Sequence, residues 1–450
     1  MRPSSTILHE AHEVTKHSFE SVQLDPNYVD SRTQPASFKV YPSFFRRFEL
    51  DLSQPFHHFL SLTSAITYQK QYRDGMHALR VQPSAGALYP TELYVQLRGL
   101  KGMLDGIYHI EPNTACLTLI YELIDDGLEG YLPEPNLIKG CIFLVSSPYF
   151  RSSWKYKNRS LRYCFLDSGH HLGAIEAAAY ISNDSYEVQF DFDQCALNED
   201  LGFENKELAM AVVVMGQPIQ KNVRRLRMPL PFVSGTDYFE ANRFIEASYR
   251  QTCVPTNSPQ QIQQPVFPMQ PEQWLLAVQQ RRSARRLYPY PIDLAALQFL
   301  WRAAWQPIPS QSIEPLQMYA VVQRVTGLQP GIYRSRVATN GNHLEFQATS
   351  YCQKLGEFHL EMGHLCINQA IARDSAVVFF LVANCLNYRV ALQQAGLMGH
   401  RIYLAATALN IGCSGIGAFY DDETQAFLAS DHPVLYAIAV GQLAVAPEMG

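Results

Sequence analysis

The second half of this chain repeats the order of sequence elements found in its first half. Four elements recur in the same order, at residues 83–95 and 309–321, 106–108 and 331–333, 162–181 and 389–409, and at the Gly-Gln pairs 216–217 and 441–442. Two long copies of one pattern are typical of a duplicated domain, whereas a solenoid shows many short repeats. We therefore expect two similar domains within one chain.

The apolar pattern predicts the same kind of fold in each copy. Short runs rich in β-branched and aromatic residues predict strands at residues 92–97, 141–147, 317–323 and 375–383. The Ala-rich segments 162–181 and 389–409 are apolar on nearly every side, which predicts one buried central helix in each copy. Strands that alternate with such helices indicate an α+β fold arranged as an α/β sandwich.

Changes in composition along the chain suggest the domain boundaries. Residues 254–271 are rich in proline and glutamine and show no periodicity, as expected of a partly extended linker. We assign residues 1–45 to an N-terminal arm and 46–250 to the first domain. Residues 251–271 then form the linker, and 272–450 form the second domain.

Composition excludes several classes of function. A net charge of -5 offers no basic field for nucleic acid or for an anionic membrane. No apolar run reaches the roughly 20 residues that span a bilayer, and the first residues lack the apolar region of a secretory signal. The nine cysteines form no CxxC pair, which argues against a zinc site and a disulfide framework. We expect a cytoplasmic protein without a metal site.

A group of arginines follows the helical stretch 271–280. Arg281, Arg282 and Arg285 surround Ser283 and offer many forked hydrogen-bond donors, which suit a phosphate group. The alternative interpretation is a basic helix face exposed to solvent.

Two glycine-containing segments add candidates for ligand binding. Residues 80–90 place small residues and a glycine ahead of a strand, so backbone amides could approach a planar ligand, although a simple turn would look the same. Residues 412–417 form a glycine-rich turn after the second central helix, a weaker signal because glycine ends many helices. The candidate cofactor-binding residues are Arg80, Pro83, Ser84, Ala85, Gly86, Leu88, Arg281, Arg282, Ser283, Arg285, Gly415, Ile416 and Gly417.

Taken together, these motifs resemble the nitroreductase superfamily. The second half resembles such a domain from Glu272 to Gln442. The first half resembles SagB-type dehydrogenases in the motifs RVQPSAGALYPTELYV, GIYHI and WKYKNRSLRYCFLDSGHH. The resemblance implies two fused nitroreductase-like domains that form an intramolecular pseudo-dimer, with FMN in the cleft between them. It further implies that the arginine segment holds the FMN phosphate and ribityl chain while residues 83–86 lie against the isoalloxazine.

The reciprocal site is expected to be degenerate. About 225 residues upstream of the arginine segment the chain reads FHHFLSL from Phe56, without an arginine. The second Pro-Ser segment, residues 309–312, lacks the glycine of the first. We therefore expect one good FMN site per chain, although Arg80 could serve a second one.

Lys155 and Tyr156 match the Lys-Tyr pair that SagB-type azoline oxidases use for proton handling. Aromatising an azoline removes a hydride and a proton from adjacent carbons, so a base is needed nearby, and a lysine or tyrosine with a shifted pKa could provide it. The alternative is a surface lysine on a polar strand-to-helix loop. Asp167, His170 and His171 are too few for a metal site, and histidines at a helix end are the simpler interpretation.

The resemblance implies an FMN-dependent oxidoreductase of SagB type that oxidises peptide azolines to azoles. One alternative is an NAD(P)H-dependent nitro- or quinone reductase, and another is a flavin- or peptide-binding scaffold without catalysis. The expected partners are a small-molecule or peptide substrate and enzymes that modify the same peptide. NAD(P)H would bind transiently, because the chain has no GxGxxG fingerprint of a dinucleotide-binding fold.

Overall fold

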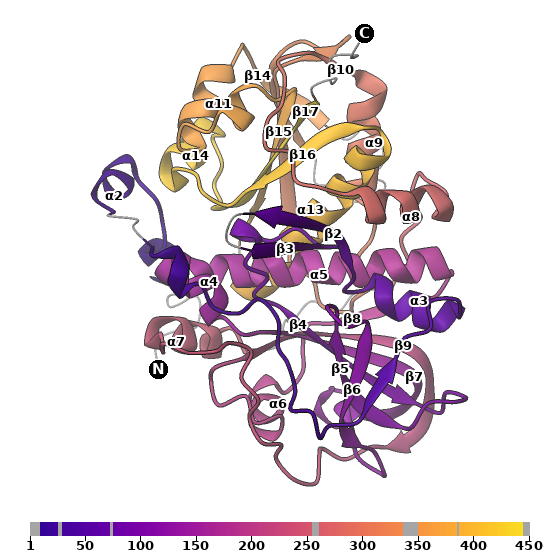
Figure 1. Cartoon of the computed structure of the whole chain (residues 1–450). Helices are drawn as coiled ribbons and strands as arrows, with labels where there is room; N and C mark the ends of the chain where they lie inside the picture. The colour runs from indigo at the N-terminus through magenta and orange to yellow at the C-terminus, as the bar shows by residue number, and fades with distance from the viewer. Residues whose placement is uncertain are drawn as a thin grey trace.

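The computed structural model describes residues 10–25, 29–72, 75–253, 261–335, 350–384 and 387–443. It consists of two β-sheets with two long helices between them (Figure 1). In the figure, the sheet of the first half lies below the long helices and the sheet of the second half lies above them. The predicted α+β fold, an α/β sandwich of two similar units, is confirmed.

The first sheet has seven strands in the order β1-β6-β5-β4-β7-β9-β8, and every pair within it is antiparallel. Its strands are β1 (Arg47–Glu49), β4 (Glu92–Arg98), β5 (Gly106–Glu111), β6 (Cys116–Glu122), β7 (Asn136–Ser147), β8 (Glu187–Gln189) and β9 (Leu208–Asn222). The predicted strands at 92–97 and 141–147 correspond to β4 and β7 and are confirmed.

The second sheet has six strands in the order β14-β13-β11-β15-β17-β16, again all antiparallel. They are β11 (Leu316–Val322), β13 (Gly331–Ser335), β14 (Ser350–Leu355), β15 (Val377–Ala383), β16 (Ile411–Ile416) and β17 (Val434–Gln442). The predicted strands at 317–323 and 375–383 correspond to β11 and β15 and are confirmed. Every residue of β15 is buried, as expected for a central apolar strand.

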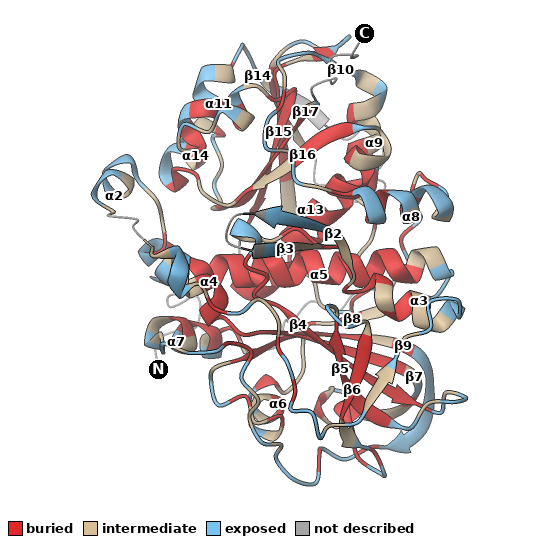
Figure 2. Ribbon diagram, in the orientation of Figure 1, coloured by how far each residue is buried: buried red, intermediate tan, exposed pale blue. Residues whose placement is uncertain are grey.

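The two predicted central helices are α5 (Ser160–Ser182) and α13 (Tyr388–Ala408), and both are confirmed. They pack against each other between the sheets, and α5 is buried along most of its length (Figure 2). They approach closely at Gly169 and Gly396, because a Cβ built on Gly169 would collide with the Gln393 carbonyl and one built on Gly396 would collide with the Leu166 carbonyl. Each glycine stands seven residues after the first arginine of its repeat, so equivalent positions of the two copies meet, as they do across a two-fold axis.

Shorter elements cover the long helices and the sheets. The helices are α2 (Phe19–Leu24), α3 (Pro55–Leu62), α4 (Phe150–Tyr156), α6 (Gln194–Asp200), α7 (Arg243–Gln251), α8 (Pro271–Gln280), α9 (Leu294–Ala304), α11 (His359–Leu365), α12 (Ala370–Arg373) and α14 (Asp421–Phe427). Single 3-10 turns lie at Ser31–Thr33, Ala85–Ala87, Leu128–Tyr131 and Lys157–Arg159, and a small parallel pair joins β10 (Ile292–Asp293) to β12 (Val325–Thr326).

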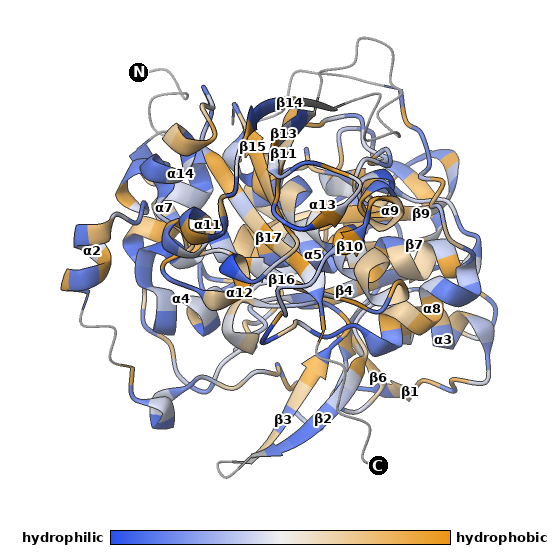
Figure 3. Cartoon of the chain, turned by 90° about the horizontal axis from the view of Figure 1, so that it is seen from above, coloured by the Kyte–Doolittle hydropathy of each residue, from blue (hydrophilic) through white to orange (hydrophobic). Residues whose placement is uncertain are grey.

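A hairpin of β2 (Ile66–Tyr72) and β3 (Gly75–Arg80) extends away from the body of the molecule (Figure 3). Its base reaches the second half, where Arg282 donates to the carbonyl and the hydroxyl of Thr67. Within the described residues, no helix is long and apolar enough to cross a membrane.

The N-terminal segment, residues 10–25, contacts both halves. His12 hydrogen-bonds through Nδ1 to the Tyr388 hydroxyl at 2.9 Å, and its carbonyl accepts from Arg162 at 2.8 Å. Asp421 forms buried ion pairs with Arg159 at 2.8 Å and Arg162 at 2.5 Å. Because buried charges are tolerated when paired and hydrogen-bonded, this cluster ties the segment to both halves.

The described part of the predicted linker, residues 261–270, packs against helix α8. Phe267 and Met269 are buried, and the ring of Phe267 stacks on Trp274 with the ring centroids 4.5 Å apart. The predicted domain boundaries stay a proposal, whereas the two sheets themselves fall within residues 47–222 and 316–442.

Candidate functional site

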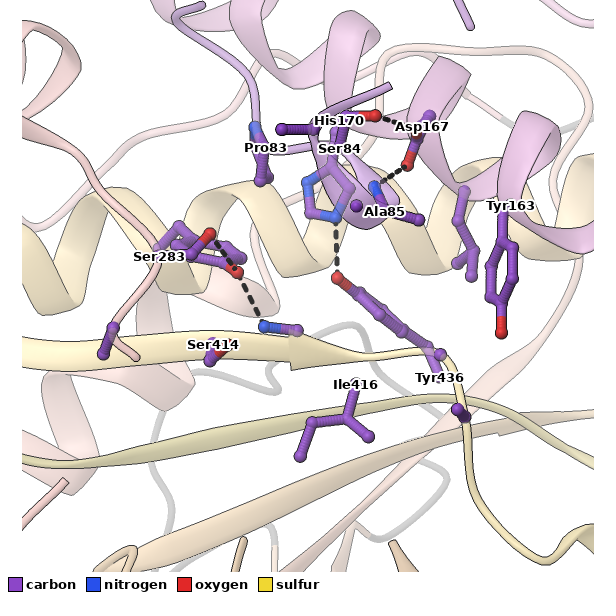
Figure 4. A pocket seen from close by; sticks show the side chains of 18 of the residues that line it. Pro83, Ser84, Ala85, Tyr163, Asp167, His170, Ser283, Ser414, Ile416 and Tyr436 are labelled. Atoms are coloured by element: carbon purple, nitrogen blue, oxygen red, sulfur yellow. Dashed lines mark hydrogen bonds between the residues drawn. The ribbon is translucent and has the colours of Figure 1, made fainter. Parts of the chain in front are cut away.

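A cavity of about 460 Å³ lies between the two halves, close to the point where α5 approaches the second sheet. Its volume falls within the range of about 300–1,000 Å³ that is usual for small-molecule and cofactor sites. The first half lines it with Leu79, Pro83, Ser84, Ala85, Gly86, Ala87, Tyr89, Tyr156, Tyr163, Leu166, Asp167 and His170. The second half adds Arg281, Arg282, Ser283, Ala284, Arg285, Gln369, Tyr403, Ser414, Gly415, Ile416, Gly417, Ala418 and Tyr436. Figure 4 shows 18 of these side chains from close by and labels ten of them.

Most of the residues predicted from the sequence meet in this cavity. It brings together residues 83–86, the arginine segment 281–285 and residues 415–417, which are far apart in the chain. Tyr156 lines the same cavity. Arg80, Leu88 and Lys155 are not part of its lining.

The loop of residues 83–90 has an unusual backbone. Gly86, Ala87 and Tyr89 have φ angles of 64°, 54° and 48°, a region that residues with a Cβ rarely adopt. A Cβ on Gly86 would also lie 2.5 Å from the Tyr156 hydroxyl, so only glycine fits there without a shift. Such a conformation persists only where the surroundings hold it, and it is common at ligand sites.

Polar contacts on both sides hold this loop. The Ser84 hydroxyl donates to Asp167 at 2.6 Å and accepts from the backbone N–H of Tyr89 at 2.9 Å. The N–H of Ala85 points at the second carboxylate oxygen of Asp167, 3.4 Å away. Arg151 donates to the Tyr89 carbonyl at 3.0 Å. The Ser84 side chain is therefore oriented by its neighbours before any ligand binds.

Asp167 is a buried acid inside the cavity, with an exposed fraction of 4%. Burial raises the pKa of this carboxyl group to about 7, because a charged carboxylate loses its water, while the hydrogen bonds from Ser84 and Ala85 act in the opposite direction. An aspartate in this state can hold or release a proton near neutral pH.

Arg281 and Arg282 connect the two halves at the cavity wall. Arg281 is 2% exposed, which contradicts the alternative of a solvated helix face for this residue. It donates through Nε to the Val81 carbonyl at 2.8 Å and through Nη2 to the Arg80 carbonyl at 3.0 Å. Its Nη1 is buried and hydrogen-bonds to no described residue. Arg285 is exposed and lines the cavity, and Arg282 is half-buried beside the β2–β3 hairpin.

Arg80 does not line the cavity, so its role as a cofactor ligand stays a prediction. Its guanidinium lies 4.7 Å from the ring centroid of Phe38 and 5.0 Å from that of Tyr89. It donates to the carbonyls of Ser37 at 2.5 Å and Thr91 at 3.2 Å. A buried cation needs such acceptors and aromatic faces, and of the four residues that supply them here only Tyr89 lines the cavity. Leu88 is buried in the core beside it.

The glycine-rich segment of the second half is a strand and not the predicted turn. Residues 411–416 form β16, which pairs with β17 along its whole length. The N–H of Gly415 donates to the Tyr403 hydroxyl at 2.6 Å, and that hydroxyl also lies 3.0 Å from the Ser283 hydroxyl. Burial raises the pKa of Tyr403 to about 12, so this tyrosine stays neutral.

The glycines of this segment make room for tyrosines. A Cβ on Gly415 would collide with the Tyr436 hydroxyl, and one on Gly417 would collide with the ring of Tyr163. The Tyr436 hydroxyl lies 2.9 Å from Nε2 of His170 (Figure 4). Burial, with help from the charge of Arg281, lowers the pKa of His170 to about 3, so its imidazole is neutral.

Lys155 and Tyr156 lie on helix α4 and not on a loop. Tyr156 is half-buried and packs edge-on against Tyr163, with the ring centroids 4.7 Å apart. Burial raises the pKa of Tyr156, and Tyr163 and Asp167 add to this effect. Lys155 is exposed at the edge of the cavity, with Nζ 5.3 Å from the centroid of the Tyr156 ring.

At the reciprocal position, groups equivalent to those of the cavity contact other residues of the protein. Strand β8 follows the first central helix as β16 follows the second. Within β8, the N–H of Val188 donates to the Pro309 carbonyl at 2.6 Å. Glu176 stands fourteen residues into its repeat, where Tyr403 stands in the other copy. It forms a buried ion pair with Arg401 at 2.6 Å and accepts from Tyr186. These contacts use the groups that would otherwise face a second ligand.

The counterpart of the arginine segment in the first half differs from the one expected from the sequence. Residues 56–62, FHHFLSL, form helix α3 and therefore correspond to helix α8. The segment that corresponds to 281–285 directly follows α3, at about residues 63–67, and it also contains no arginine. The distance in sequence between equivalent positions is therefore not constant at about 225 residues, because the extended hairpin and loops of unequal length occur in the two copies.

Several cavity residues were not identified from the sequence as ligand-facing. They are Tyr163, Asp167, His170, Gln369, Tyr403 and Tyr436. An aromatic residue inside an apolar helix or strand looks the same whether it faces the core or a cavity, so no local signal separates these tyrosines. The repeat itself carried one signal, since Asp167 aligns with Gln394 and is therefore an acid in one copy only.

The cavity fits FMN in its chemistry. Arg282 and Arg285 line one part of it and offer cationic, forked donors for a terminal phosphate. The buried Nη1 of Arg281 and Nδ1 of His170 hydrogen-bond to no described residue, so polar partners for a ligand remain. The glycine at position 86 lets backbone come close to a planar ring. Among the described residues, no group of three His, Cys, Asp or Glu side chains could hold a metal ion.

Comparisons with known proteins agree with this geometry. Residues 278–442 match the model of the Nitroreductase family. A curated protein from Methanocaldococcus jannaschii, named as a nitroreductase, is 27% identical over 124 residues, which cover 24% of this chain and 61% of that protein. A solved structure from Anabaena variabilis, also assigned as a nitroreductase, is 25% identical with a TM-score of 0.81. That match covers 97% of this chain and 99% of the Anabaena chain.

Proposed function

We propose that this chain, which is nitroreductase-like in fold and carries a nitroreductase-family match over residues 278–442, is an FMN-dependent oxidoreductase. The observation that supports this most directly is that the arginine segment of one half and residues 83–86 of the other line a single cavity. Arg282, Ser283 and Arg285 would hold the phosphate end, and residues 83–86 with 415–417 would enclose the planar ring. FMN, when bound, supplies a two-electron redox centre that can accept or give a hydride.

The protein's own groups would orient the substrate and handle protons. Part of the wall consists of the buried tyrosines Tyr89, Tyr163, Tyr403 and Tyr436, which keep water from that side of the cavity. Tyr156, kept neutral by its raised pKa, can donate a hydrogen bond toward a substrate, and Lys155 lies next to it at the rim. Of this pair, the Lys155 amine would take the proton that a substrate carbon loses as its neighbouring carbon gives up a hydride, and Tyr156 would remain the hydrogen-bond donor.

The substrate class that we propose is a peptide azoline, which such a reaction converts to an azole. The support for it is the Lys-Tyr pair at the mouth of the cavity, since hydride transfer to a nitro group or a quinone needs no base beside the substrate. An azoline is formed by loss of water from a cysteine, serine or threonine side chain and its neighbouring amide. A cyclodehydrating enzyme is therefore the expected partner.

A second candidate is an NAD(P)H-dependent nitro- or quinone reductase. The family match over residues 278–442 and the two nitroreductase-named relatives favour it. In that case NAD(P)H would enter the same cavity transiently, and Lys155 and Tyr156 would affect turnover little.

The first experiment identifies the cofactor. The purified protein should absorb in the blue, and heat should release mainly FMN, with close to one flavin per chain at saturation. The reciprocal position supports this stoichiometry because Arg401, Glu176 and Tyr186 contact one another there. A colourless protein that does not bind added FMN would contradict the proposal and favour a non-catalytic scaffold. Two flavins per chain would contradict the single site.

The second experiment separates the two enzymatic candidates. Lys155→Ala and Tyr156→Phe should keep their flavin but oxidise an azoline peptide about 10²–10⁴-fold more slowly, the usual worth of general acid–base assistance. Lys157→Ala is a matched control, since its ammonium group pairs with Asp25 at 2.9 Å and does not line the cavity. Parental rates in both test variants, together with rapid NAD(P)H-driven reduction of nitroaromatics or quinones, would favour the second candidate.

A further inference from the structure

We propose that Asp167 and Ser84 form a proton-holding pair, in which Asp167 takes up one proton when the flavin bound in the cavity is reduced. The inference rests on the proposed function, because it assumes that a flavin occupies the cavity. It adds a residue that neither the family match nor the sequence motifs assign. Asp167 would act through Ser84 and through its charge, as a positioning residue.

The geometry places the acid at the ligand's side of the fold. Asp167 projects from the N-terminal half of helix α5 into the cavity, and it contacts Ser84 of the loop that lines the cavity (Figure 4). One carboxylate oxygen is 2.6 Å from the Ser84 hydroxyl and the other is 3.4 Å from the N–H of Ala85. Because Tyr89 N–H also donates to the Ser84 oxygen, the hydroxyl hydrogen of Ser84 is directed at Asp167.

Protonation of Asp167 would reverse this hydrogen bond. An ionised carboxylate only accepts, so it holds the Ser84 hydroxyl hydrogen. A protonated carboxyl can instead donate to the Ser84 oxygen, which frees the Ser84 hydrogen for an acceptor in the cavity. One O–H bond forms at Asp167 with a proton from solvent, and no other covalent bond changes. Ser84 thus presents an acceptor to the cavity in one state and a donor in the other.

Electrostatics couples this change to electron uptake. Two added electrons bring negative charge into the cavity, and a nearby like charge disfavours an ionised carboxylate. The groups around Asp167 leave it able to respond, because its pKa of about 7 is close to neutrality. His170 on the same helix and Tyr403 on α13 have pKa values of about 3 and 12, so neither changes charge there.

The other ionisable groups around the cavity come from each element that packs against it. Tyr156 on α4 and Tyr436 on β17 both sense the charge of Asp167, and burial raises the pKa of both. Arg281, Arg282 and Arg285 enter from the segment after α8, and Lys155 stands at the rim. Because the tyrosines remain neutral and the arginines remain charged, the proton that moves near pH 7 is assigned to Asp167.

The internal repeat offers a natural comparison. The residue equivalent to Asp167 is Gln394, and the serine equivalent to Ser84 is Ser310. Gln394 accepts from the backbone N–H of Glu314 at 3.0 Å, and the Ser310 hydroxyl donates to the Ser312 carbonyl at 3.1 Å. Both copies therefore keep the serine, but the acid is present only in the copy that lines the cavity.

The test measures the flavin midpoint potential against pH in the purified, flavin-loaded protein. The slope of this plot reports the number of protons taken up with each pair of electrons. From about pH 7 up to the higher pKa that Asp167 would have beside the reduced flavin, the parent should take up as much as one proton more than Asp167→Asn, so its potential should fall more steeply in that range. Below pH 7 the two plots should run parallel, because Asp167 is then protonated in both redox states. A purely structural role of Asp167 would shift the potential without changing its slope.

Two further variants sharpen the test. Ser84→Ala removes the hydrogen bond that stabilises the carboxylate, so the steeper region should begin at a higher pH. Asp184→Asn is a matched control, because this acid follows the end of α5, is exposed and does not line the cavity, and its plot should follow the parent. Parallel plots for the parent and Asp167→Asn, in proteins that both hold FMN, would overturn the proton-holding pair alone. A chain that binds no flavin would overturn the proposed function and this inference with it.

Discussion

Replacing Asp167 by asparagine should change how the stability of the flavin-free protein depends on pH. The substitution preserves the size of the side chain and leaves an oxygen that can accept from Ser84, but it removes the titrating proton. Because every other ionisable group is the same in both proteins, the difference between them isolates Asp167.

The expected magnitude follows from the shift in the pKa. In the folded protein the pKa of Asp167 rises from its ordinary value of 3.8 to about 7, so the folded state binds this proton more tightly than the unfolded chain does. Its contribution to stability is fully present below pH 3.8 and is lost as the pH rises through 7. A shift of about three units, at about 1.4 kcal/mol per unit, corresponds to about 4 kcal/mol. The side chain is 4% exposed, so solvent screening does little to reduce this figure.

The assay is urea unfolding of the parent and Asp167→Asn at a series of pH values, followed by circular dichroism. The free energy of unfolding of the parent, relative to the variant, should fall by about 4 kcal/mol between acid and mildly alkaline pH. Most of that fall should occur between pH 4 and pH 7, because the unfolded and folded pKa values bracket this range. A difference that stays constant within about 1 kcal/mol over the whole range would show that Asp167 is not a buried, protonatable acid.

Three further substitutions test other parts of the site. Arg285→Ala should weaken FMN binding by about 1.5–3 kcal/mol, or roughly 10- to 150-fold, because it removes a charge-assisted hydrogen-bond donor. An unchanged affinity in a titration with FMN would show that Arg285 does not bind the phosphate. Gly86→Ala should lower the free energy of unfolding by about 1–3 kcal/mol, because it strains the backbone and brings a Cβ against a tyrosine hydroxyl. Gly102 also has a positive φ but lies in open space, so Gly102→Ala should lower this free energy less. Equal losses in the two variants would argue against the clash. Glu176→Gln should lower the free energy of unfolding by about 3–5 kcal/mol, because it leaves a buried arginine without its carboxylate. Glu204→Gln changes an exposed ion pair and should lower it by about 1 kcal/mol or less. Similar losses would mean that the Glu176 ion pair does not hold the reciprocal position together.

Periodic patterns in the chain were sufficient to predict the architecture. The central helices at 162–181 and 389–409 and the strands at 92–97 and 375–383 were identified correctly, because local residue preferences and the burial pattern agree there. The duplication could be seen as well, since the order of the elements is a property of the chain itself. The resemblance of the motifs to nitroreductases, and not the periodicity, implied that residues 83–86 and 281–285 belong to one site.

The direction in which each side chain points could not be predicted in the same way. Arg80 and Arg281 are both arginines next to the loop, yet the first donates to the carbonyls of Ser37 and Thr91 and the second lines the cavity. Residues 411–416 were expected to turn and instead form a strand, because pairing with β17 outweighs the preference of glycine for turns.

The sequence by itself determined that two similar α/β units are joined in one chain and that arginines and a Pro-Ser-Ala-Gly segment are available for a ligand. Only the tertiary structure decided that these segments share one cavity, that Asp167 lies in its wall, and that Arg401 and Glu176 pair at the reciprocal position. The physical reason is that a carboxyl group has its ordinary pKa wherever water reaches it. The change to a pKa of about 7 arises when two helices and a loop from distant parts of the chain enclose Asp167 and exclude that water.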